Sequence, residues 1–183
     1  MPIGSLVTGT LAGLVASETR AAHTLRLVVA ASLGIIAIAL GFEYIGKYHP
    51  CPLCLMERYA YYFAIVAGAA GLAAQRAGHG GGWLRLLLAA IAIGYLINAG
   101  LGAHHAGVEW KWWAGPDTCT APLPKLTGGT GLDLSQPVIR CDEAPWRFAG
   151  LSFAGWNAVL SALLAILAAW GLGKGSGKSG DGG

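Results

Sequence analysis

The stretch CPLCLMERYAYYFAIVAGAAGLAAQ, residues 51–75, joins two closely spaced cysteines to a long apolar run. A Cys-x-x-Cys pair holds two sulfurs close enough to form and break a disulfide, and it lets one thiol lose its proton more readily than a free cysteine does. From Tyr59 to Gln75 the stretch contains no Asp, Glu, Lys or Arg, which is typical of a helix inside a membrane. We therefore expect a dithiol at the edge of a lipid bilayer.

The whole chain is unusually apolar. Of its 183 residues, 55% are hydrophobic and 11% are charged, whereas ordinary globular domains carry about 25% charged residues. Further runs without charged residues cover 27–42, 86–108 and 148–173. Because a crossing takes about 20 mostly apolar residues, the runs 27–42 and 59–75 must recruit charged flanks, among them Arg58. The composition predicts an all-α membrane protein, a four-transmembrane-helix bundle with helices at about 25–44, 55–75, 83–103 and 149–172.

Two tails and two cysteine-bearing loops complete the predicted organisation. Residues 1–24 are expected to form a cytoplasmic tail rather than a secretory signal, because they lack a basic start and contain Gly4, Gly9 and Gly13. The Gly/Ser/Lys-rich segment 173–183 is expected to be a disordered cytoplasmic tail. The loops at about 45–54 and 104–148 lie on one side of the membrane, because two crossings separate them.

All four cysteines fall in these two loops, so they share a compartment: Cys51, Cys54, Cys119 and Cys141. Basic residues divide evenly between the two sides of the membrane, but three on the cysteine side lie in the long loop, where they count for less. The cysteine loops are therefore predicted to face the periplasm or an equivalent compartment. Disulfides persist in that compartment.

Two cysteine pairs permit three disulfide connectivities. Cys119 and Cys141 are compatible with a structural staple, but a bond between Cys51 and Cys54 would close so small a ring that it constrains little chain entropy. Such a pair is more often labile and catalytic. A zinc site would need four convergent ligands, and His49 is the only imidazole close to the first pair in sequence. We therefore expect no metal.

Three polar side chains share a helix face with Cys54. On a wheel of 100° per residue, Glu57, Arg58 and Tyr61 all lie within about 60° of Cys54. Arg58 alone would be explained as an arginine that reaches the lipid interface. Beside a redox thiol, a fixed cation would also stabilise a Cys54 thiolate and negative charge on a quinone oxygen. This face is our candidate quinone site.

Two adjacent histidines, His104 and His105, end the third predicted helix on the same side of the membrane. Neighbouring residues on a helix point in different directions, so at most one of them can face the Cys54 stripe. The alternative is a pair of interfacial histidines without a chemical role. The aromatic segment that follows is typical of a membrane interface.

Together these features resemble the disulfide bond formation protein B (DsbB) family of bacterial inner-membrane oxidases. The resemblance covers about residues 25–170 and rests on the four-helix pattern and the two loop cysteines. Its specific motifs are Cys51-Pro52-Leu53-Cys54-Leu55-Met56-Glu57-Arg58 and the run Cys141…Pro145-Trp146…Gly150-Leu151.

The resemblance implies a path for electrons. Cys119 would be attacked by a periplasmic DsbA-type oxidase of the thioredoxin fold, and Cys141 would exchange with Cys51. Cys54 would then donate electrons to a membrane quinone, ubiquinone or menaquinone, with help from Arg58. Glu57 and one of His104 or His105 would belong to the quinone pocket.

Two other functions remain open. A vitamin K epoxide reductase-like quinone oxidoreductase also combines four helices with two cysteine pairs, but there the membrane-edge Cys-x-x-Cys follows the loop pair, whereas here it comes first. The second alternative is a non-enzymatic membrane protein with structural disulfides. We expect the protein to contact membrane lipid and a quinone, and we expect no nucleic-acid partner.

Overall fold

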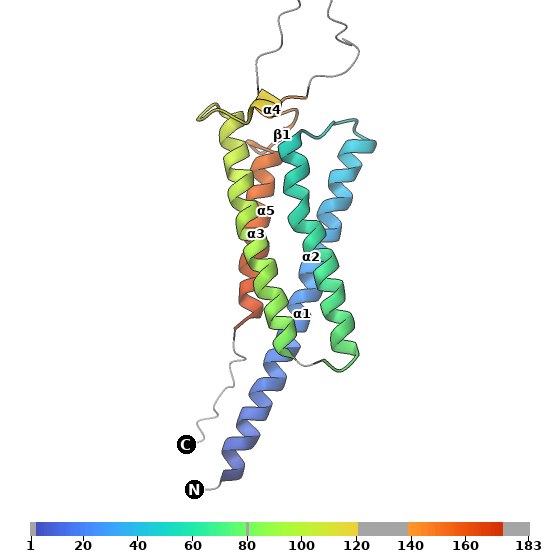
Figure 1. Ribbon diagram of the computed structural model, residues 1–183, viewed down its shortest axis with the longest axis vertical. Helices are drawn as coiled ribbons and strands as arrows, with labels where there is room; N and C mark the ends of the chain where they lie inside the picture. The colour runs from blue at the N-terminus through green and yellow to red at the C-terminus, as the bar shows by residue number, and fades with distance from the viewer. Residues whose placement is uncertain (1–2, 80, 121–138, 174–183) are drawn as a thin grey trace, which may run out of the picture.

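Four long helices dominate the part of the chain that the computed structural model describes, residues 3–79, 81–120 and 139–173, with only the backbone for 3–17 and 81. They are α1 (Ile3–Tyr44), α2 (Pro52–Arg76), α3 (Gly81–Glu109) and α5 (Phe153–Gly171), and they run side by side (Figure 1). The short helix α4 (Asp117–Thr120) and the strands β1 (Arg147–Phe148) and β2 (Leu151–Ser152) lie at one end of this bundle. The start of α1 and the end of α5 lie at the other end.

Local sequence explains where α2 and α5 begin. Cys51 is the N-cap of α2, its sulfur accepts a hydrogen bond from the backbone N–H of Cys54, and Pro52 occupies the first helical position. Proline suits that position because its missing N–H would have no partner there. Ser152 caps α5 by accepting from the N–H of Gly155 at 3.2 Å. Both caps lie at the same end of the bundle as α4.

A tight hairpin leads into α5. β1 and β2 pair antiparallel, with Arg147 opposite Ser152 and Phe148 opposite Leu151. The two residues between them, Ala149 and Gly150, both have positive φ, at 50° and 83°. Two-residue hairpins favour such turns because their twist matches that of the strands. The hairpin fixes the backbone directly before the Ser152 cap.

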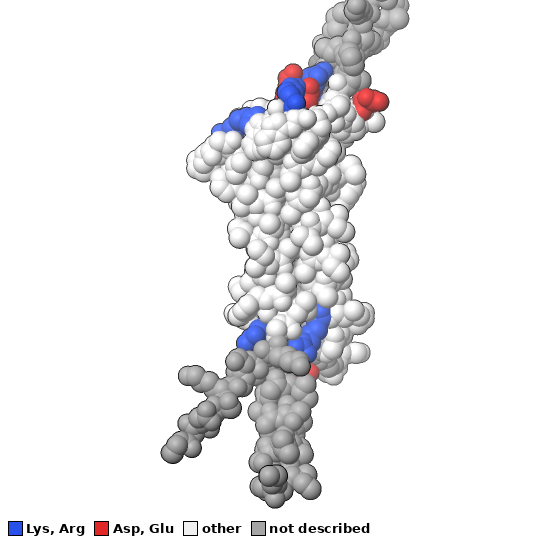
Figure 2. Space-filling view, turned by 90° about the vertical axis from the view of Figure 1, so that its left-hand side faces the viewer, with Lys and Arg blue, Asp and Glu red and all other residues white. Residues whose placement is uncertain are grey.

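Three helical segments of the described chain are long and apolar enough to cross a membrane: Glu18–Tyr44, Gly82–Glu109 and Phe153–Gly171. Charged residues gather at the two ends of the bundle and leave an uncharged band between them (Figure 2). Large apolar side chains such as Ile38, Val66 and Ile166 are exposed along the helices. A soluble monomer rarely exposes so much apolar surface. The prediction of an all-α membrane protein is thus confirmed.

Helix α2 packs with the other three but is less apolar. It carries Glu57, Arg58 and three tyrosines near its start, and it is not among the three segments that qualify for a crossing by composition. That α2 is a fourth membrane span therefore stays a prediction.

The helix bounds differ from the expected ones mainly at α1 and α3. α1 begins at Ile3, far before the expected start near residue 25, and α3 continues to Glu109 instead of ending near 103. Glycine costs only about 1 kcal/mol in a helix, so Gly4, Gly9 and Gly13 do not stop α1. Residues 121–138 of the predicted long loop and 174–183 of the predicted C-terminal tail lie outside the described residues.

The bundle core combines apolar packing with a small polar network. Leu25 of α1, Leu88 of α3 and Leu164 of α5 are among its buried members. Asn98 of α3 donates hydrogen bonds to Asn157 and to Ser161 of α5, at 3.1 and 2.9 Å. Polar side chains inside a membrane bundle join helices in this way because lipid offers no alternative partners.

Helices α3 and α5 approach each other closely at Gly102. A Cβ added there would lie 2.9 Å from the backbone nitrogen of Ala158 and 3.0 Å from the backbone oxygen of Ala154. Gly100, on the same helix, would meet nothing within 4 Å. Gly102 therefore sets the spacing between the helix that carries the two histidines and the helix that follows the hairpin.

We predict that Gly102→Ala lowers the free energy of unfolding by about 1–3 kcal/mol, because the added methyl group must push the α5 backbone away. The measurement is thermal or denaturant unfolding in detergent. Gly100→Ala is the matched control and should not destabilise the protein, since its Cβ meets open space. Equal effects of the two substitutions would contradict the close approach.

Candidate functional site

The Cys51–Cys54 pair lies at the start of α2, at the cysteine end of the bundle. Its two sulfurs are 2.7 Å apart and are not joined by a disulfide. Cys51 is buried and Cys54 is half-buried. Because the Cys51 sulfur also accepts from the Cys54 backbone N–H at 3.2 Å, the helix start itself holds the two thiols together.

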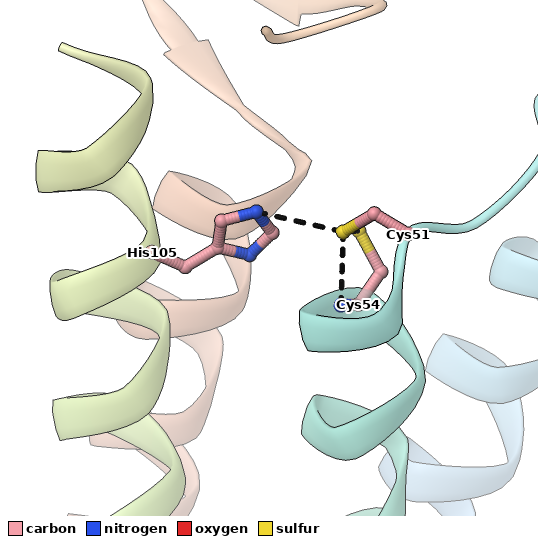
Figure 3. Close-up of side chains that lie close together, drawn as sticks. All are labelled: Cys51, Cys54 and His105. Carbon is pink, nitrogen blue, oxygen red and sulfur yellow. Dashed lines mark hydrogen bonds between the residues drawn. The ribbon is translucent and has the colours of Figure 1, made fainter. Parts of the chain in front are cut away.

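His105 brings an imidazole from α3 to this pair (Figure 3). Its Nε2 lies 3.6 Å from the Cys51 sulfur, and its Nδ1 lies 2.8 Å from a carboxylate oxygen of Glu57. His104 instead stacks on Trp113, with ring centroids 5.6 Å apart. The sequence limited the choice to one of the two histidines, and the structure places His105 at the cysteines.

The pKa of the Cys51 thiol is lowered to about 5. The hydrogen bond from Cys54 is the largest cause, and the hydrogen bond and charge of His105 add to it, so that together they outweigh the opposing effect of burial. Cys51 is therefore a thiolate at neutral pH. The sequence had led us to expect a stabilised thiolate at Cys54, whereas in the structure it is the flanking Cys51 that gains these donors.

Arg58 forms an ion pair that the sequence did not suggest. Its Nη1 donates to a carboxylate oxygen of Glu43, near the end of α1, at 2.6 Å. The pair is mostly but not fully removed from solvent. It ties the first turns of α2 to α1 and fixes the guanidinium on the side of the helix that Cys54 shares.

A cavity of about 360 Å³ opens beside Cys54. Glu57, Arg58 and Tyr61 line it together with Cys54, so the predicted stripe does face one common space. The Tyr61 hydroxyl donates to Asn157 at 2.8 Å. The cavity has the size of a small-molecule site, and its few polar groups in an otherwise apolar lining are also typical of one.

Aromatic side chains form the outer wall of this cavity. Trp146 stacks on Phe153 with ring centroids 4.7 Å apart, and Phe42 meets Phe153 edge to face at 4.9 Å. Sequence reasoning missed this wall. Trp146 belonged to a quoted motif without a role, and Phe42 and Phe153 come from helices that are distant in sequence.

The second cysteine pair forms a disulfide between Cys119 of α4 and Cys141. Both residues are buried, with 8% and 0% of their surface exposed. They share one apolar cluster with Cys51 and Leu53, against which Cys54 also packs. The sequence left the pairing of the four cysteines open, and the structure joins Cys119 to Cys141. All four sulfurs lie at the same end of the bundle.

Two cations flank the second disulfide. Asp142, directly after Cys141, pairs with Arg140 at 2.8 Å and with Lys111, which follows α3. The hydrogen bond from Arg140, followed by that from Lys111, lowers the pKa of Asp142 to about 2. Asp142 therefore stays ionised and links the Cys141 segment to the end of α3.

The matching family model and the similar proteins carry the same family name. The family model described as disulfide bond formation protein DsbB matches residues 21–171. A protein named disulfide bond formation protein B from Acidovorax sp. (strain JS42) is 30% identical over 158 residues, which cover 82% of this chain and 86% of that protein. Its namesake from Aromatoleum aromaticum (strain DSM 19018 / LMG 30748 / EbN1) is 31% identical over 153 residues, 74% of this chain and 87% of that protein. No solved structure matches the chain.

The family model covers α2, α3, α5, the part of α1 from residue 21 onward and both cysteine pairs. The similarity to the curated relatives extends over most of each chain. These matches agree with the membrane-helix bundle and with the paired cysteines at one of its ends. The chain belongs to the disulfide bond formation protein B (DsbB) family.

Proposed function

We propose that this protein is a membrane disulfide oxidoreductase that reoxidises a periplasmic thiol oxidase of the DsbA type and passes the electrons to a membrane quinone. One observation carries the proposal: the Cys51–Cys54 dithiol stands at the edge of an apolar cavity near the end of a membrane bundle. Family membership supports the disulfide chemistry. Few other functions need a dithiol beside a lipid-facing cavity.

The first step is thiol–disulfide exchange at the Cys119–Cys141 bond. A thiolate of the reduced partner attacks the sulfur of Cys119, the S–S bond breaks, and Cys141 leaves as a thiolate. The second partner thiol then releases Cys119, so that the partner gains a disulfide and this chain gains two thiols. The buried cluster that holds all four cysteines supports direct exchange between the two pairs.

In the second step a quinone oxidises the Cys51–Cys54 pair, which is reduced in the structure. The Cys51 thiolate and the Cys54 thiol give up two electrons and one proton, and the quinone takes these with a second proton from solvent to become a quinol. The new Cys51–Cys54 disulfide then exchanges with the Cys119 and Cys141 thiols, which restores the Cys119–Cys141 disulfide and the Cys51–Cys54 dithiol.

Arg58 lines the cavity and supplies a fixed positive charge, which favours negative charge on an acceptor oxygen. His105, held by Glu57, lies beside the Cys51 sulfur and stabilises its thiolate.

The cavity fits a quinone ring by its volume and its lining. A volume of about 360 Å³ accommodates a single ring with small substituents. Phe42, Trp146 and Phe153 offer aromatic faces, and Arg58 offers a donor for a ring oxygen.

We further propose that α2 is a fourth span and that the cysteine end faces the periplasm of a bacterial inner membrane. α2 has 25 residues, enough for a crossing, and it exposes apolar side chains such as Phe63 and Val66. The opposite end carries basic residues in short flanks, including Arg76 and Arg85, which favours a cytoplasmic location.

Two substitutions distinguish the roles of the two cysteine pairs. Cys54→Ser should abolish quinone reduction with either a reduced DsbA-type partner or a small dithiol as the electron donor, because the Cys51–Cys54 disulfide can no longer form. Cys119→Ser should abolish only the reaction with the protein partner. Quinone consumption followed by its ultraviolet absorbance measures both. Full activity of the Cys54 variant would reject the assigned electron path.

We predict that Arg58→Ala raises the quinone KM by about tenfold or more, since a hydrogen bond to a charged group contributes about 1.5–3 kcal/mol. Steady-state kinetics and thermal unfolding in detergent are compared. Arg76→Ala, at the far and exposed end of the same helix, is the control and should leave KM unchanged. A lower melting temperature with unchanged quinone kinetics would assign Arg58 a purely structural role.

The lowered pKa of Cys51 predicts a pH dependence. In reduced Cys119→Ser/Cys141→Ser protein, ultraviolet thiolate absorbance should be present at neutral pH and should be lost as the pH falls through about 5. Cys54→Ala removes the hydrogen bond that contributes most to the lowered pKa of Cys51. The midpoint of the Cys51 titration should therefore move upward, toward that of an ordinary thiol. His105→Ala should move it in the same direction. A parent protein that titrates like a free cysteine would contradict the arrangement.

A further inference from the structure

Three side chains that bind soft metal ions converge at the head of α2. The sulfurs of Cys51 and Cys54 and a ring nitrogen of His105 all lie within 4.8 Å of one another. Two of the residues come from the start of α2 and the third from α3 (Figure 3). In the sequence, His49 is the only histidine close to the Cys51–Cys54 pair. The packing of α3 instead brings His105 to it.

We propose that the reduced protein binds one zinc-class divalent cation through Cys51, Cys54 and His105, and that this ion blocks the dithiol. Cys51 binds as the thiolate, Cys54 releases its thiol proton to solvent, and two metal–sulfur bonds and one metal–nitrogen bond form. No electrons are transferred. Because both sulfurs are then ligands, the metal-bound form cannot form the Cys51–Cys54 disulfide, and metal binding and electron transfer exclude each other.

The distances suit this ion. With Zn–S near 2.3 Å and Zn–N near 2.0–2.1 Å, a tetrahedral site places sulfur and nitrogen about 3.6 Å apart. The Cys51 sulfur and His105 Nε2 are 3.6 Å apart. Two sulfurs in such a site stand about 3.8 Å apart, so the observed 2.7 Å must widen. Cys54 is half-buried and borders the cavity, which gives its side chain room to turn.

Glu57 orients His105 for this role. Its carboxylate holds Nδ1 at 2.8 Å, which leaves Nε2 directed at the cysteine sulfur. Histidines that bind metals usually donate their second N–H to a carboxylate in this manner, and loss of that partner weakens metal affinity about 10–100-fold. Both residues are at least nine-tenths buried, so the arrangement is rigid.

The surroundings also carry an excess of potential negative charge. Glu109 lies one helical turn after His105 and interacts electrostatically with His105, Cys51 and Arg147. Its Oε2 is buried and accepts no hydrogen bond from any described residue. Two thiols and two carboxylates, Glu57 and Glu109, thus interact with one another and with the imidazole, and Arg147 is a cation that acts on Glu109. Buried charges are usually paired or bound to metal, and a divalent cation would compensate for them.

The test measures metal binding directly, without quinone or partner protein. Full-length Cys119→Ser/Cys141→Ser protein in detergent is reduced with a phosphine, titrated with Co²⁺ and monitored by thiolate-to-metal charge-transfer absorbance, with Zn²⁺ as competitor. We expect one equivalent to bind. His105→Ala and Glu57→Gln should each weaken binding at least tenfold, and Cys54→Ser should abolish the charge-transfer band of the two-thiolate site.

His104→Ala is the matched control, because this neighbour stacks on Trp113 away from the sulfurs, and it should bind as the parent does. Oxidised wild-type protein should not bind, which needs no substitution and so does not depend on the folding of a variant. Equal affinity of the His104 and His105 variants, or binding by the oxidised protein, would overturn the proposal. Absence of binding would overturn it too.

A second measurement connects the site with turnover. Zn²⁺ should inhibit quinone reduction by wild-type protein, and a chelator should restore it. If Zn²⁺ inhibits the His105→Ala variant as strongly as it inhibits the wild-type protein, the proposed site is contradicted. Because the Co²⁺ titration requires no catalysis, failure of the proposed oxidase activity and failure of the metal site give different results.

Discussion

The hydrogen bond from the Cys54 backbone N–H to the Cys51 sulfur is the contact on which the rest of the site depends. It is both a helix cap and a means of fixing a nucleophile. A cap satisfies a backbone donor that the first helical turn would otherwise leave without a partner. Here the capping atom is a thiol sulfur, so the position of this thiol is determined by the start of the helix itself.

Neighbouring elements complete the site around this cap. α3 contributes the imidazole, and α1 contributes the carboxylate that holds Arg58. The aromatic wall comes from α1, from the start of α5 and from Trp146 directly before β1. The close approach at Gly102 sets the distance between two of these helices. A change in helix spacing would therefore alter thiol chemistry and cavity shape together, although no catalytic residue had been replaced.

Much of this architecture can be predicted from the sequence, because it depends on local patterns. Runs without charged residues indicate the helices, and the spacing from Cys54 to Arg58 and Tyr61 places these side chains along one face, as the shared cavity confirms. The start of α1 was not visible, because isolated glycines in an otherwise helix-compatible stretch give no clear boundary. The choice between His104 and His105 depends on how α3 is rotated, which only packing determines.

The burial of the Cys119–Cys141 bond has a kinetic consequence. Only 8% of the Cys119 surface is exposed, so a folded protein cannot bring its own thiolate in line with this sulfur while α4 stays in place. α4 is four residues long, and so short a helix opens at little cost compared with the bundle. The rate of exchange with a large reductant would then equal the intrinsic reaction rate multiplied by the fraction of open molecules, whereas a small thiol would be less restricted.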